Sequence, residues 1–228
     1  MKRQIVTLPL SLMRVTSIDW DIDWRGAPEA GLTDGNTQVV MNQVPRWVGH
    51  LDMTMRDDWL RSWRAHRWQA QGRVGIYRLY MFDPLGFNLQ AIVGRAVAET
   101  GIPFATGERF SSGSGFSPNV YLEAAAAASA GDTYVTVTCT DADLVPAPGQ
   151  IMSAGDWPMG VVSVEANGDD TYTLGIQMPL RADMAAGDLV SCMATGLFEV
   201  DDDLAGAAPY GKLNRSAFSV SFREVLNR

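Results

Sequence analysis

Residues 18–24 read Ile-Asp-Trp-Asp-Ile-Asp-Trp, a strict alternation of apolar and acidic side chains. Because successive side chains of an extended strand point to opposite faces, this pattern predicts a β-strand with one buried face and one face in water. Alternating aspartates also occur in calcium loops, but such a loop needs a glycine at its sixth position and a glutamate at its twelfth. Trp24 and Ala30 stand there instead. We therefore interpret the run as a strand and expect no metal site.

Further strand patterns lie on both sides of this run. The N-terminal stretch, residues 1–12, is expected to open with a strand. Runs of alternating or β-branched residues bounded by Gly, Pro and Asp predict strands, and Asp83-Pro84 is such a boundary. The other strands expected in this part of the chain are 37–41, 46–55, 74–82, 88–97 and 217–225.

Between residues 56 and 71, apolar residues recur about every fourth position instead of every second. Trp59 and Trp63 fall four residues apart, Asp57 and Asp58 precede them, and Gly72 follows. Apolar side chains at this spacing, acidic residues in the first turn and a terminal glycine predict one amphipathic helix. Its outer face carries basic side chains, which we interpret as a solvated surface: Arg61, Arg64 and Arg67.

Charge divides the chain into two parts. Its 228 residues carry a net charge of -8, yet residues 122–192 contain ten acidic residues and one basic residue, Arg181. The remainder is nearly neutral and holds six of the seven tryptophans. We expect residues 1–121 and 193–228 to form one β domain, and residues 122–192 to form a smaller domain inserted into it.

The acidic segment predicts a small β-barrel. Five short strands are expected, separated by turn signals such as Pro148-Gly149 and Asn167-Gly168. The alanine run 124–128 fits either one turn of helix or an extended linker. An OB-like or similar barrel of five or six strands fits this pattern. The expected strands are 134–140, 150–152, 160–165, 171–177 and 188–193.

Two cysteines, Cys139 and Cys192, fall in the first and last of these strands. They could approach each other in a barrel. Two buried free thiols are favoured over a disulfide, because two cysteines are too few for a disulfide-stabilised secreted scaffold.

The sequence shows no motif for catalysis, cofactor binding or metal binding. His50 and His66 have no neighbouring residues at zinc-ligand spacing, and the glycines at 113 and 115 lack the lysine of a phosphate loop. Paired carboxylates such as Asp169/Asp170 are interpreted as solvated charge rather than a glycosidase pair. No stretch reaches the length of a membrane span, and the acidic charge argues against phosphate binding. We expect a protein without catalytic residues, cofactor or sequence-specific nucleic-acid partner.

Several segments together resemble the distal tail and minor tail proteins of long-tailed, siphovirus-like bacteriophages. They are residues 36–40, Pro45-Arg46-Trp47 leading into a Leu-x-Met strand, the tryptophan-rich helix ending at Gly72-Arg73, the strand closing on Asp83-Pro84, the loop GIPFATGERFSSGSGF (101–116), and the closing stretches 197–199 and 215–225.

This resemblance implies a mainly β fold: a tail-tube-like β-sandwich or barrel domain with one packed α-helix, plus an inserted OB-like barrel. It implies a structural role in the virion, where a homo-oligomeric ring, usually a hexamer, joins the tail tube protein to the hub protein in the baseplate after assembly in the host cytoplasm. We expect the loop 99–117 and the N-terminal strands to form the contact between subunits, with Arg109, Phe110 and Phe116 as interface residues.

A second hypothesis is a carbohydrate-binding module. In this interpretation the inserted barrel recognises a host surface glycan through aromatic rings that stack on sugar rings. The candidate residues are Trp157, Tyr134 and Tyr172, of which Trp157 lies in a Gly-Asp-Trp-Pro turn.

Overall fold

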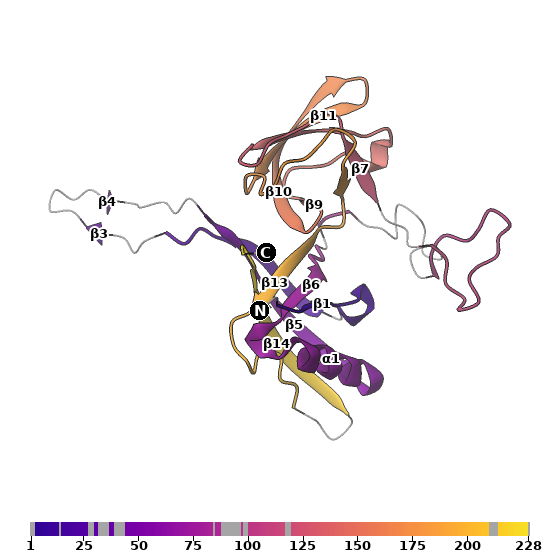
Figure 1. Ribbon diagram of the computed structural model, residues 1–228, viewed down its shortest axis with the longest axis vertical. Coiled ribbons are helices and arrows are strands. Elements are labelled where there is room, and N and C mark those ends of the chain that lie inside the picture. Colours follow the sequence, from indigo (N-terminus) through magenta and orange to yellow (C-terminus); the bar gives the residue numbers. More distant parts are fainter. Residues whose placement is uncertain are drawn as a thin grey trace. The chain divides into compact units, whose positions relative to one another are not determined.

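The computed structural model describes residues 3–13, 15–26, 30–31, 37–38, 44–83, 85–87, 97, 100–116, 120–209 and 214–227. It comprises two units, the first formed by residues 1–80 and 196–228 and the second by residues 81–195 (Figure 1). The charge pattern placed the boundaries at 121/122 and 192/193. The segment after residue 80 groups with the barrel because Met81 donates its N–H to the carbonyl of Ala194, and Phe87 packs against the barrel core.

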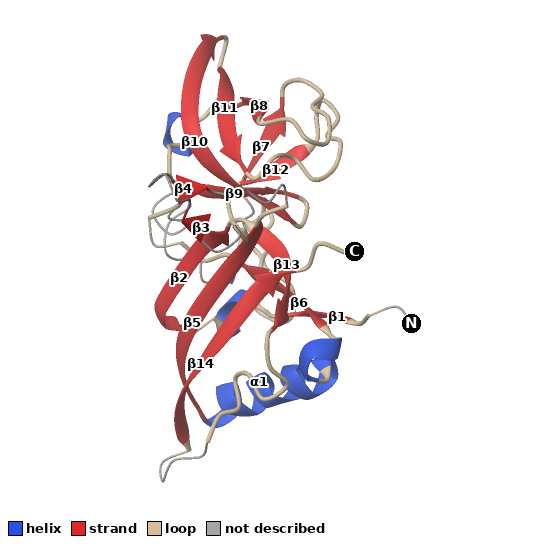
Figure 2. Cartoon of the chain, turned by 90° about the vertical axis from the view of Figure 1, so that its left-hand side faces the viewer, coloured by secondary structure: helices blue, strands red, loops and turns tan. Residues whose placement is uncertain are grey.

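The first unit is built on a six-stranded sheet in the order β1-β6-β13-β14-β5-β2. The helix α1 (Asp57–Ala70) packs on one face of this sheet (Figure 2). Two short 3-10 helices, η1 (Leu10–Leu12) and η2 (Gly72–Val74), follow β1 and α1. The strands are β1 (Ile5–Thr7), β2 (Val15–Asp23), β5 (Arg46–Arg56), β6 (Ile76–Tyr80), β13 (Thr195–Val200) and β14 (Arg215–Glu224).

The Ile-Asp-Trp alternation forms β2, an edge strand paired antiparallel with β5. Asp19 and Asp21 are exposed, whereas Trp20 is half-buried. A methyl group at Gly49 would overlap the Trp20 ring, so the glycine gives this indole its space against the sheet. The strand ends at Asp23, and Trp24, expected on the buried face, is 48% exposed.

Aromatic side chains fill the core between α1 and the sheet. Trp63 is buried, stacks on Phe218 with ring centroids 5.4 Å apart, and donates from Nε1 to the carbonyl of Gly206 at 2.9 Å. Tyr77 meets Phe222 edge-on. The helix was expected at 56–71 and forms at 57–70, with Leu60 also buried.

Two expected strands fall partly or wholly beyond the described residues. Only Thr37–Gln38 of the expected strand 37–41 is described, as β4, which pairs with β3 (Ala30–Gly31). Of the expected strand 88–97, residues 88–96 lie outside the described part of the chain, and Val97, which is described, is helical rather than extended.

The second unit contains a closed six-stranded barrel in the order β10-β11-β8-β7-β12-β9. Its interior is aliphatic, with Val137, Met152 and Leu174 fully buried. The short helix η3 (Ala142–Leu144) follows β8. The strands are β7 (Tyr121–Ala124), β8 (Tyr134–Thr138), β9 (Ile151–Ala154), β10 (Trp157–Gly168), β11 (Thr171–Gln177) and β12 (Leu189–Ser191).

Over the residues that the structure describes, a mainly β chain with the helix α1 and a small barrel is therefore confirmed. Five of the barrel strands were expected; the sixth, β7, was not, and it runs into the alanine run at Ala124. The alanine run is extended: Ala125 donates to the carbonyl of Thr136, and Ala128 forms a bridge with Met184. Among the described helices, none is long and apolar enough to cross a membrane.

Candidate functional site

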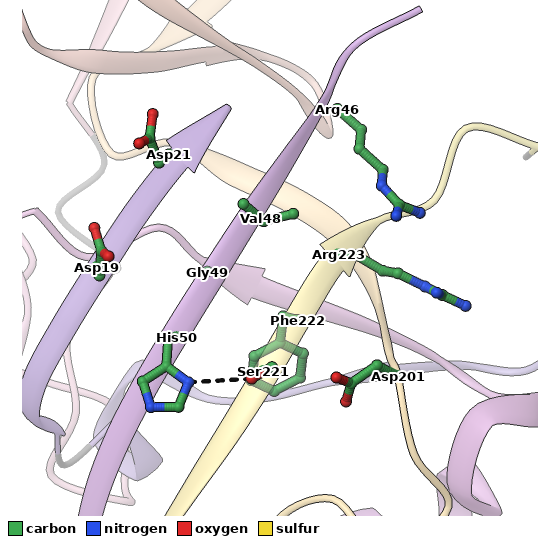
Figure 3. Close-up of a pocket in the computed structure, with 10 residues that line it drawn as sticks. All are labelled: Asp19, Asp21, Arg46, Val48, Gly49, His50, Asp201, Ser221, Phe222 and Arg223. Carbon is green, nitrogen blue, oxygen red and sulfur yellow. Dashed lines mark hydrogen bonds between the residues drawn. The ribbon is translucent and has the colours of Figure 1, made fainter. Parts of the chain in front are cut away.

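The face of the sheet opposite α1 is polar and shallowly hollowed over about 350 Å³. Residues that pair across three strands share this face, because Asp19 lies opposite His50 and His50 lies opposite Ser221. Figure 3 shows these side chains on β2, β5 and β14, with Arg223 and Asp21 along the next row. The strand period therefore brings residues distant in sequence to one surface.

Ser221, His50 and Asp52 form a series on this face, in which the first two side chains are hydrogen-bonded and the last two lie within ion-pair distance. Ser221 Oγ lies 3.1 Å from His50 Nδ1 (Figure 3), and His50 Nε2 lies 3.5 Å from an Asp52 carboxylate oxygen. A serine-nucleophile triad joins serine to Nε2 and aspartate to Nδ1, the reverse order. It also needs donors aimed at an oxyanion in a water-excluding site, whereas the His50 side chain is 53% exposed. This series therefore supports pairing between β5 and β14 better than acyl transfer.

Ion pairs extend across the same sheet. Glu199 accepts from Arg3 at 2.7 Å and from Arg223 at 2.9 Å, so one carboxylate bridges two guanidinium groups. Arg46 pairs with Asp23 at 3.3 Å near the opposite edge. These partly exposed pairs match opposite charges across the sheet, and pairs of this kind contribute little to stability.

A separate contact joins the end of α1 to the loop after β13. The backbone N–H of Arg73 donates to Asp203 Oδ1 at 3.0 Å, and the guanidinium of Arg73 donates to the same oxygen at 3.2 Å. These two hydrogen bonds lower the pKa of Asp203 below its ordinary value. The loop 201–206 thereby brings Gly206 against Trp63.

The loop 100–116 contains a cluster of three phenylalanines, which we call the Phe cluster: Phe104, Phe110 and Phe116. Every pair of rings meets edge to face, with centroids 5.1 to 5.2 Å apart. The side chains are nevertheless 39%, 44% and 49% exposed, and they belong to neither described core cluster. Three neighbouring rings left open to water are an apolar patch of the kind that marks contact with another molecule.

The same pattern of backbone hydrogen bonds occurs twice in this loop. Phe104 donates to the carbonyl of Glu108 and accepts from the N–H of Gly107, and Phe110 makes the same two bonds with Ser114 and Gly113. Both glycines have positive φ, 85° and 82°, which favours glycine at the turns. The sequence signal is Phe-x-x-Gly-x-x repeated at residues 104 and 110 and followed by Phe116.

The expected interface residues lie in this loop. Phe110 and Phe116 belong to the Phe cluster, and Arg109, immediately before Phe110 in sequence, is exposed. Phe104 was missed by the sequence interpretation, although the six-residue repeat points to it. The backbone bonds of the repeat and the Ile102–Phe116 bridge give this loop a defined conformation of its own.

The three expected glycan-contact residues are dispersed on the barrel. Trp157 lines a depression of about 310 Å³ together with Arg181, Asp183 and Asp188, whereas Tyr134 and Tyr172 are not among its lining residues. Tyr134 is 64% exposed, and Tyr172 packs half-buried against the barrel core. Trp157 is the one of the three that lies in a hollow with hydrogen-bonding side chains around it.

The two barrel cysteines are buried and free. Burial raises the pKa of Cys192 to about 12, and the nearby Cys139 adds to this rise. Burial likewise raises the pKa of Cys139. Thiols with raised pKa values hold little thiolate and react slowly, so these side chains act as small apolar groups in the barrel interior.

Metal ligands do not cluster in the part of the chain that the structure describes, where no group of three or more His, Cys, Asp or Glu is placed to hold an ion. No protein-family model matches the chain, and no curated protein has a matching sequence.

Proposed function

We propose that this chain is a non-catalytic structural subunit of a bacteriophage tail tip, a distal tail protein that assembles with copies of itself into a ring. In this role the ring joins the tail tube protein to the hub protein in the baseplate of the virion. The resemblance of the sequence to distal and minor tail proteins suggests this assembly, which we take to be hexameric.

The observation that carries the proposal is the Phe cluster. Three phenylalanines held together on a hydrogen-bonded loop, each more than a third exposed, have no role in either core cluster. Burying such rings against another protein gains about 1.5 to 3 kcal/mol for each side chain that is fully covered. In a closed ring this contact forms at every subunit interface, so that no interface is left without a partner.

A test replaces Phe104 and Phe110 with serine in the full chain. We expect the variant to keep the circular dichroism of the wild type and to lose its oligomeric particles, as measured by light scattering after size exclusion and by negative-stain microscopy. Leu204→Ser is the matched control, because Leu204 is 74% exposed and lies outside the Phe cluster. Unchanged particles in the Phe variant would contradict the proposed contact.

The Trp157 depression favours a second candidate function, recognition of a host surface glycan by the barrel. An aromatic ring beside an arginine and two carboxylates combines a stacking surface with hydrogen-bonding groups. We expect binding on a glycan array by the full chain and its loss in Trp157→Ala, with Tyr134→Ala as the matched control. If the wild-type chain binds no glycan, this second function is wrong.

A further inference from the structure

The Trp157 depression lies at one end of the barrel. Trp157, the first residue of β10, pairs with Ala154, the last residue of β9, and Ala154 also pairs with Val190 at the start of β12. All residues that line the depression lie between positions 154 and 189, within the second unit. The mouth of a β-barrel is a frequent place for a small-ligand site.

Most of the remaining lining comes from the segment between β11 and β12, which is firmly attached to the barrel. Leu180 and Met184 of this segment are buried members of the barrel core. Met184 and Ala128 exchange two backbone hydrogen bonds of 2.8 and 2.9 Å, and the carbonyl of Leu180 accepts from the N–H of Gly131 at 2.8 Å. The depression therefore has its shape before a ligand arrives, so binding requires little ordering of the chain.

Two carboxylates in the lining are each held in place through one oxygen. Asp183 Oδ1 accepts from the backbone N–H of Ala130 at 2.8 Å, and Asp188 Oδ2 accepts from the N–H of Ala185 at 2.7 Å. Both side chains are exposed, and among the described residues neither is paired with a basic side chain. The other oxygen of each carboxylate can therefore accept hydrogen bonds from a ligand.

The charge around the depression selects against acidic ligands. Residues 122–192 contain ten acidic residues and one basic residue, Arg181. Arg181 lines the depression and has interactions within its own chain, so the lining holds one positive and two negative side chains. A sugar that carries carboxylate or phosphate groups is repelled by this excess, whereas an ammonium group is attracted and gains charge-assisted hydrogen bonds.

We infer that the Trp157 depression binds an amino sugar whose nitrogen is not acetylated, with the ammonium group at the carboxylates of Asp183 and Asp188 and the sugar ring against Trp157. This inference rests on the proposed glycan recognition and names the class of sugar. A lysine side chain from a protein partner carries the same charge but has no flat ring to stack on an indole, so the combined lining favours the sugar.

The test compares two oligosaccharides of equal length, one of glucosamine and one of N-acetylglucosamine. Calorimetry with the full chain at mildly acidic pH, where the glucosamine amine is protonated, should show about tenfold tighter binding of the glucosamine oligosaccharide. Asp183→Asn/Asp188→Asn should abolish this preference, because asparagine keeps an oxygen for each backbone N–H and removes the charge. Circular dichroism checks the fold of the variant.

The matched control is Asp169→Asn/Asp170→Asn, which makes the same charge change in the exposed turn between β10 and β11 and should keep the preference. Both residues have positive φ, which asparagine tolerates.

Three results would overturn the inference: equal or weaker binding of the glucosamine oligosaccharide by the wild-type chain, a preference that survives in Asp183→Asn/Asp188→Asn, or equally tight binding of a lysine oligomer. Glycan recognition still stands if the wild-type chain binds other sugars on the array. A chain that binds no glycan contradicts both.

Discussion

The two units bury different kinds of side chain. The sheet unit packs Trp63, Tyr77, Phe198, Phe218 and Phe222 between one helix and one face of a sheet, whereas the buried core of the barrel consists of aliphatic residues, Met and Cys. A closed six-stranded barrel encloses a narrow interior that branched and flexible side chains fill well. An open sheet under a helix accommodates large rings where small residues such as Gly49 and Gly206 make room. The geometry of each unit thus selects its core residues.

The largest effect is expected from Trp63→Ala in the sheet unit. The substitution removes a buried ring, its stacking on Phe218 and its hydrogen bond to Gly206. We expect the free energy of unfolding to fall by about 3 to 5 kcal/mol in a urea titration followed by fluorescence. Trp68→Ala is the control and should change it by less than about 0.5 kcal/mol, because Trp68 is exposed. Equal losses would contradict the assigned core.

The barrel should lose somewhat less from Leu174→Ala. Leu174 is fully buried among aliphatic neighbours, and its truncation should cost about 2 to 5 kcal/mol. Six of the seven tryptophans lie in the sheet unit, so tryptophan fluorescence reports mainly on that unit and circular dichroism on both. We expect the variant to shift the circular-dichroism transition and to leave most of the fluorescence transition in place. Identical shifts by both probes would show that the units unfold together.

A smaller effect is expected from Gly49→Ala. The added methyl group would overlap the Trp20 ring, and overpacking of this kind costs about 1 to 3 kcal/mol. The double variant Gly49→Ala/Trp20→Leu should lose less free energy of unfolding than the sum of the losses of the two single variants. Simple additivity in a double-mutant cycle would show that Trp20 does not lie over Gly49.

The smallest effect concerns the barrel thiols. The pKa of Cys192 is raised from 9.0 to about 12 by burial and by Cys139, so the folded chain keeps a proton that the unfolded chain loses between these values. Stability should therefore decrease as the pH rises above about 9. Cys192→Ala should reduce the slope of this decrease in alkaline urea titrations. A thiol reagent at mildly alkaline pH should label both cysteines only after unfolding, and rapid labelling of the folded chain would contradict their burial.

Sequence periodicity predicted the parts of the fold that local patterns determine. The four-residue spacing of Trp59 and Trp63 located α1 within one residue at each end, and the alternation at 18–24 located β2 except for its first three residues. β7 was missed because Tyr121–Ala124 runs into an alanine stretch whose conformation depends on pairing with β12 and β8. Trp24 was misplaced because the apolar pattern continues one residue beyond the strand.

The surfaces were harder to predict than the strands. Phe110 and Phe116 were expected at an interface, but the cluster with Phe104 depends on two turns that bring residues six apart together. This cluster depends on tertiary arrangement, which alternation and charge counts do not contain.

The ring-forming account is tested most directly by the mass and shape of the purified wild-type chain. Light scattering after size exclusion, with negative-stain images of the same fractions, should be recorded over a concentration series in the micromolar range. We predict closed ring particles whose mass is an integral multiple of the monomer mass. A folded chain that has the monomer mass at every concentration would contradict it.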